Sequence, residues 1–238
     1  MIQQTPQFKF VDRGFGRSIL LIPGWATDCE IFGRLDIPYD YLLPEGAAGH
    51  AEETGKAVEA LPEQVRARGI DILGWSMGGY IAADIFTARP AIFDRLILVS
   101  MRQRYDKSGL DDVRSFVKRS RAAYLKRFYG GLFSDGEDAD IAWFKESLLK
   151  KYTGDTAALG LFEGLDYLAQ AELKAELLND PKVTLVHGDR DVIAPIGEAS
   201  SMSARMPLAK FIVIKGAGHL PLFRKEFSDI FGAATHAR

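Results

Sequence analysis

The chain has 238 residues, of which 47% are hydrophobic and 26% charged, a balance typical of a globular protein and too hydrophobic for a disordered one. Its net charge of −2 argues against a general nucleic-acid-binding protein, which usually has an excess of lysine and arginine. A single cysteine excludes an internal disulfide, and no signal peptide or membrane-spanning stretch is recognisable, so we expect a cytoplasmic protein.

Short apolar runs alternate with longer helical stretches along the chain, which is typical of parallel strands joined by crossover helices. Helices are expected over residues 51–68, with a break at Pro62, over 77–88 and over 222–231. The predicted fold is therefore α/β, with a mostly parallel sheet flanked by helices. The predicted strands span residues 18–22, 39–43, 70–74, 96–100, 183–187 and 211–215.

Residues 101–180 interrupt this alternation, because they contain helical patterns with no convincing strand between them. An apolar stripe in the first part and one or two further helices over 157–178 suggest a compact helical unit. We therefore expect a core formed by residues 1–100 and 181–238, with residues 101–180 as a helical insertion.

The run Gly74-Trp75-Ser76-Met77-Gly78 follows an apolar strand and opens a helix, which is the context of a nucleophile elbow. The pattern alone would occur by chance in roughly one chain in ten of this length, so the strand and helix around it carry the prediction. Side chains at the two glycines would clash in so sharp a turn. The alternative interpretation is that Ser76 is an ordinary turn residue.

A serine hydroxyl is a poor nucleophile at neutral pH and needs a base within hydrogen-bond reach. Of the four histidines, His219 lies just past the last predicted strand, in a short glycine-containing loop at the carboxyl edge of the sheet. His187 ends the preceding strand, His50 lies in a glycine-rich loop and His236 in the terminal tail. We expect His219 to be the base.

Two carboxylates, Asp189 and Asp191, follow the same strand end and could orient this histidine. Either gives the chain order serine, aspartate, histidine, which differs from the orders of trypsin-like and subtilisin-like proteases. The backbone N–H groups of Trp25 and Met77 are the expected oxyanion donors, because Gly24 lets the backbone approach the substrate and Met77 follows the nucleophile.

Together these motifs resemble the α/β-hydrolase superfamily along the whole chain. In that family the acid follows the strand-end glycine by three residues, which selects Asp191, and a helical cap is inserted after the sixth core strand. One departure is Pro23, where many relatives have histidine before the glycine, and the short N-terminal part leaves room for only part of the antiparallel edge. The matching segments are Pro23-Gly24-Trp25, Gly74-Trp75-Ser76-Met77-Gly78-Gly79, Gly188-x-x-Asp191 with Pro195, and Gly218-His219.

More narrowly, the chain resembles the pimeloyl-acyl-carrier-protein methyl ester esterases of biotin synthesis, through Ile22 to Trp25, the elbow and the run Gly164-Leu165-Asp166-Tyr167-Leu168. This resemblance implies a serine esterase that needs no metal or organic cofactor and docks an acidic carrier protein on its cap. Residues 101–130 carry nine basic and three acidic side chains, a net charge of +6. Arg114, Lys118 and Arg121, at i, i+4 and i+7, should share a helix face that steers such a partner.

Three alternatives stay open. A general carboxylesterase or lactonase would use the same residues without a protein partner, and so would an enzyme that hydrolyses carbon–carbon bonds. A non-catalytic protein that binds a small molecule on the same fold is the alternative from another class. The basic run itself is in many proteins only a solvated helix face.

Overall fold

A seven-stranded sheet forms the centre of the computed structural model, which describes residues 8–45, 51–154 and 160–232. The strand order is β1-β3-β2-β4-β5-β6-β7, and every neighbouring pair is parallel except β1 and β3. The predicted fold class, a mostly parallel sheet flanked by helices, is confirmed. The strands are β1 (Phe8–Val11), β2 (Ser18–Ile22), β3 (Asp40–Pro44), β4 (Ile70–Trp75), β5 (Phe93–Val99), β6 (Val183–Gly188) and β7 (Lys210–Ile214).

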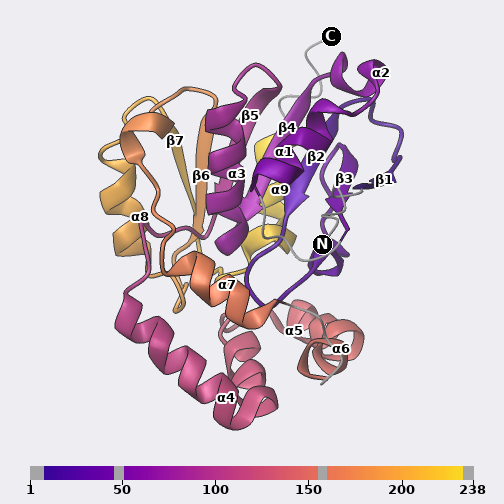
Figure 1. Cartoon of the computed structure of the whole chain (residues 1–238). Coiled ribbons are helices and arrows are strands. Elements are labelled where there is room, and N and C mark those ends of the chain that lie inside the picture. The colour runs from indigo at the N-terminus through magenta and orange to yellow at the C-terminus, as the bar shows by residue number, and fades with distance from the viewer. Residues whose placement is uncertain (1–7, 46–50, 155–159, 233–238) are drawn as a thin grey trace, which may run out of the picture.

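Helices cover both faces of the sheet, which explains why its central strands are continuous apolar runs. Every residue of β2, β4 and β6 is buried. In Figure 1, α1 and α3 lie in front of the sheet and α9 behind it. Pro62 divides the predicted helix 51–68 in two, as expected. The flanking helices are α1 (Ala51–Glu59), α2 (Glu63–Arg66), α3 (Met77–Ala88), α8 (Ile196–Ser203) and α9 (Lys225–Gly232), with short 3-10 turns η1 (Cys29–Phe32) and η4 (Pro221–Phe223).

The segment between β5 and β6 is helical and lies beyond one end of the sheet, at the bottom of Figure 1. It follows β5, the fifth of the described strands. No described helix is long and apolar enough to cross a membrane. The segment contains α4 (Lys107–Gly130), α5 (Asp138–Phe144), the π-helical turn η2 (Lys145–Leu149), α6 (Lys150–Thr153), α7 (Leu161–Leu168) and the 3-10 turn η3 (Ala175–Leu178).

The sheet differs from the predicted strands by more than one residue in two places, β1 and the start of β5, where charged residues interrupt the apolar pattern. The edge strand β1 is four residues long, includes Lys9 and pairs antiparallel with β3. The strand β5 begins three residues before its predicted start, at Phe93. Its Arg95 is accommodated there because the guanidinium lies 2.8 Å from the buried carboxylate of Asp71 on the neighbouring strand.

Candidate active site

Ser76 lies in the sharp turn between β4 and α3, with φ of 53° and ψ of −125°. This backbone conformation is uncommon for a residue with a side chain and is often found at functional sites. A Cβ on Gly74 would lie 2.3 Å from the Gly78 carbonyl oxygen, and one on Gly78 would lie 2.3 Å from that of Ile22. The turn can therefore form only with glycine at both positions.

His219 is fully buried and lies between the serine and an aspartate. Its Nε2 is 2.9 Å from Ser76 Oγ, and its Nδ1 is 2.7 Å from Asp191 Oδ2. Because Nδ1 donates to the carboxylate, Nε2 is the atom that accepts the serine proton. The indole N–H of Trp75 donates to the His219 carbonyl oxygen at 2.7 Å. Trp75 therefore holds the histidine loop in addition to packing in the core.

The Asp191 carboxylate is surrounded by donors. Its Oδ1 accepts the N–H groups of Ile193 and Ala194, both at 2.8 Å, and its Oδ2 also lies 3.3 Å from His187 Nε2. Burial alone would raise the pKa of Asp191, but the electrostatic interaction with the adjacent His219 and these hydrogen bonds hold the pKa well below its usual range. The carboxylate is thus ionised at neutral pH and can stabilise an imidazolium.

The other sequence candidates lie elsewhere. Asp189 is exposed, and its Oδ1 accepts the N–H of Gly216 at 2.6 Å, so it braces the histidine loop and does not contact the ring. His187 is buried and donates from Nε2 to the Ala194 carbonyl at 2.6 Å. His50 and His236 lie outside the described residues.

The predicted oxyanion donors flank the serine. A Cβ on Gly24 would lie 3.1 Å from Ser76 Cβ, so the backbone leading to Trp25 passes directly beside the nucleophile. Met77 is the first residue of α3, where an N–H has no partner within its own helix. The Trp25 side chain is fixed by an indole hydrogen bond to the Leu161 carbonyl at 2.8 Å.

A cavity of about 310 Å³ opens on Ser76 and is largely apolar. Sequence reasoning missed three polar residues in its wall, Arg102, Tyr105 and Asp106, although all three closely follow the carboxyl end of β5. Burial raises the pKa of Tyr105 to about 12, so its hydroxyl keeps its proton at neutral pH, and Tyr105 and Ser76 line the same cavity. The cavity is lined by Trp25, Ser76, Arg102, Tyr105, Asp106, Gly109, Leu110, Val113, Tyr124, Phe128, Leu165, Leu168 and Ile193.

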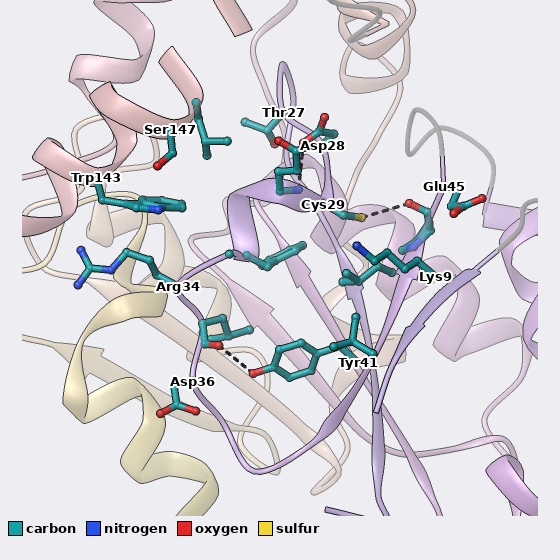
Figure 2. Close-up of a pocket in the computed structure, with 18 of the residues that line it drawn as sticks. Lys9, Thr27, Asp28, Cys29, Arg34, Asp36, Tyr41, Glu45, Trp143 and Ser147 are labelled. Carbon is teal, nitrogen blue, oxygen red and sulfur yellow. Dashed lines mark hydrogen bonds between the residues drawn. The ribbon is translucent and has the colours of Figure 1, made fainter. Parts of the chain in front are cut away.

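A larger cavity of about 970 Å³ lies against the β1–β3 edge and includes none of the predicted site residues (Figure 2). Its wall mixes acidic, basic and aromatic side chains. Cys29 lies in it with Sγ 3.2 Å from the Pro44 carbonyl oxygen. Burial and the nearby Asp28 raise the pKa of this thiol to about 12, so it is not a reactive thiolate at neutral pH.

The predicted docking residues do not share one regular helix face, which corrects that expectation. Ser120 has non-helical backbone angles (φ −157°, ψ 79°) and interrupts α4 between Lys118 and Arg121. Arg114 forms an ion pair with Asp166, and the Arg121 guanidinium donates to the Gly154 carbonyl. Lys118 remains exposed.

No group of three or more His, Cys, Asp or Glu side chains in the described part of the chain could hold a metal ion.

Comparison with known proteins gives one family. A model of the alpha/beta hydrolase family matches residues 10–228. A pimeloyl-[acyl-carrier protein] methyl ester esterase of Nitrosomonas europaea is 27% identical, with 92% of this chain and 96% of the relative covered. An enzyme of the same name from Xylella fastidiosa is 26% identical, covering 94% and 95%. The solved esterase from Exiguobacterium antarcticum has a TM-score of 0.76 and 18% identity, covering 98% and 96%.

Proposed function

Because this chain belongs to the alpha/beta hydrolase family, we propose that it is a serine esterase in which Ser76 is the nucleophile, His219 the base and Asp191 the orienting acid. One observation carries the proposal: His219 contacts Ser76 Oγ at 2.9 Å with one ring nitrogen and Asp191 at 2.7 Å with the other. This geometry allows proton transfer from hydroxyl to imidazole without rearrangement of the site.

The reaction proceeds in two steps. Ser76 Oγ bonds to the ester carbonyl carbon while its proton moves to His219 Nε2, and the N–H groups of Trp25 and Met77 hold the oxyanion. The carbon–oxygen bond of the ester then breaks, and His219 gives the proton to the departing alcohol. Water deprotonated by His219 releases the acid and restores Ser76. Asp191 keeps the imidazole in the required tautomer and stabilises its charge, and no cofactor is needed.

The finer proposal is that the substrate is the methyl ester of pimeloyl-acyl-carrier protein, so that the enzyme acts in biotin synthesis in the cytoplasm. The names of the relatives support this, and so does an apolar cavity suited to an aliphatic acyl chain. Residues 101–180 would act as a cap over the core formed by 1–100 and 181–238, and an acidic carrier protein would dock on that cap. The leaving group would be methanol.

A general small-ester carboxylesterase without a protein partner is the second candidate. It is favoured by the internal bonds of Arg114 and Arg121, which engage two of the three predicted docking cations within the chain. An arginine already paired with a carboxylate has less charge to offer a partner.

The nucleophile assignment is tested by Ser76→Ala. We expect it to abolish hydrolysis of a short p-nitrophenyl ester and labelling by a fluorophosphonate, with an unchanged circular dichroism spectrum, because the hydroxyl is the attacking atom. Turnover retained by the folded variant would remove Ser76 from this role. A wild-type protein that is neither labelled nor active would favour a non-catalytic binder.

The docking assignment is tested first by Lys118→Glu, because Lys118 is the exposed member of the three and its loss should least disturb the fold. We expect the KM for a carrier-linked methyl ester to rise up to about fivefold, in proportion to one surface ion pair, while a small ester is unaffected. The triple reversal of Arg114, Lys118 and Arg121 should enlarge the effect. Equal changes for both substrates would leave the general carboxylesterase as the better description.

A further inference from the structure

A buried carboxylate outside the proposed triad lies beside the histidine loop. Glu137, in the turn that precedes α5, is 3% exposed. Its Oε2 accepts the backbone N–H of Ser134 at 2.6 Å and the backbone N–H of Gly218 at 3.2 Å, and lies 3.1 Å from the Ser134 hydroxyl oxygen. Its Oε1 has no hydrogen-bond partner within the described chain. Glutamate is rarely buried so completely, because a desolvated carboxylate is costly, so this position calls for an explanation.

The partner that matters is Gly218, since it directly precedes His219. The turn containing Glu137 packs tightly on this loop: the Leu220 N–H donates to the Leu132 carbonyl at 3.0 Å, and the Ser134 hydroxyl donates to the Gly216 carbonyl at 2.5 Å. A Cβ on Gly218 would lie 2.8 Å from the Leu132 carbonyl oxygen. The inserted segment therefore contacts the loop on both sides of the histidine.

The core holds the same loop from elsewhere. Trp75 binds the His219 carbonyl, Asp189 binds the Gly216 N–H, and the Arg190 N–H donates to the Ala217 carbonyl at 3.0 Å. These contacts fix the loop to β4 and to the end of β6. Glu137 adds a carboxylate acceptor from the inserted segment. The position of the histidine therefore depends on contacts both from the core and from this segment, which are far apart in sequence.

We propose that Glu137 is a positioning residue, which fixes His219 relative to Ser76 by holding the Gly218 N–H and so couples the inserted segment to the chemistry. The inference rests on the proposed function, in which His219 is the base. A misplacement of about 1 Å in a reacting group can cost about 100-fold in rate. Glu137 is not part of the cavity wall at Ser76, so its loss acts on kcat and not on KM.

A purely structural role is the competing explanation. Ser134 and Glu137 have the spacing of a capping box, which stabilises the start of a helix. That role predicts a lower melting temperature on substitution of Glu137 but an undisturbed histidine in the folded protein.

The experiment compares Glu137→Ala, Glu137→Gln and the control Asp138→Ala in the full chain, since Asp138 is exposed and adjacent. The readouts are the melting temperature, kcat and KM for a p-nitrophenyl ester, and the low-field proton NMR signal of His219 Nδ1–H. We expect Glu137→Ala to lower kcat by about 10- to 100-fold at unchanged KM and to shift or broaden the signal. Glu137→Gln keeps an oxygen for the Gly218 N–H and should stay within a few-fold of wild type, as should the control.

A folded Glu137→Ala variant with the kcat and NMR signal of the control would overturn the proposal and leave only the capping role. If that variant does not fold, Glu137→Asp tests the same contact, because the shorter side chain moves the carboxylate away from the Gly218 N–H. An unchanged kcat and signal there would count equally against it. The NMR signal does not require turnover, so a failure of this inference is distinguishable from a failure of the esterase proposal.

Discussion

At the scale of single residues, the site is built from backbone placements that only particular side chains allow. Ser76 has a positive φ because Gly74 and Gly78 leave room for the turn, and Gly218 is needed where the inserted segment touches the histidine loop. His219 lies within hydrogen-bond distance of both Ser76 and Asp191. The proposed mechanism uses no metal or cofactor. Tyr105 carries a further hydroxyl in the wall of the cavity that opens on Ser76.

We expect Tyr105→Phe to lower kcat about tenfold, because the Tyr105 hydroxyl in the cavity wall can donate one hydrogen bond of about 1.4 kcal/mol to the reacting group at Ser76. Tyr124→Phe is the matched control, because its ring lines the same cavity and packs edge-on against Trp25. Steady-state kinetics on a short ester measure both. Equal kcat values for the two variants would mean that the Tyr105 hydroxyl does not act in the reaction.

At the scale of elements, α7 is locked to the core through Trp25. The indole donates to the Leu161 carbonyl, and its ring packs edge-on against Phe128 with a centroid distance of 5.1 Å. Gly164 faces this ring so closely that a Cβ there would lie 2.6 Å from Trp25 Cδ1. The short run that suggested the narrower resemblance thus includes the glycine that lets α7 pack on the oxyanion loop.

Gly164→Ala tests this packing. Alanine favours a helix over glycine by about 1 kcal/mol, but overpacking a well-fixed ring costs about 1–3 kcal/mol, so we expect a net loss of stability. The KM for esters should rise as well, because Trp25 and Leu165 line the cavity. Gly130→Ala in α4 is the control, since a Cβ there meets nothing within 4 Å and should leave stability equal or higher. Denaturant unfolding compares them, and a stabilised Gly164→Ala variant would contradict the packing argument.

At the scale of the whole molecule, all eight tyrosines have a pKa raised chiefly by burial, and Tyr105 reaches about 12. In the unfolded chain they ionise near pH 10, whereas in the folded chain they keep their protons to higher pH. Above about pH 10 the unfolded state therefore binds fewer protons than the native state, and stability must fall as the pH rises.

We therefore expect the free energy of unfolding to decrease steeply above about pH 9, by up to about 1.4 kcal/mol per pH unit for each tyrosine involved. Urea titrations at a series of pH values measure this decrease. Tyr80→Phe should make the slope shallower, because one buried phenol no longer titrates. A flat profile from pH 8 to pH 11 would show that the buried tyrosines do not control alkaline stability.

Local patterns in the sequence were enough to predict the parallel strands, the elbow at Ser76 and the histidine loop. Each depends on neighbours in the chain: an apolar run of strand length, a pair of glycines around a serine, or a glycine before a histidine. Charged residues hid the edge strand β1 and the start of β5. There the pattern fails because Arg95 is neutralised by Asp71, a partner 24 positions away that no local window includes.

The sequence by itself thus determined the fold class and indicated the three side chains and two amides of the proposed site. Only the tertiary structure brought Tyr105 into the cavity wall beside Ser76, interrupted α4 at Ser120 and buried Glu137 against Gly218. The physical reason is that these features are contacts between distant segments, whose geometry is set by packing and by the need to satisfy buried polar groups, and neither is visible in local residue order.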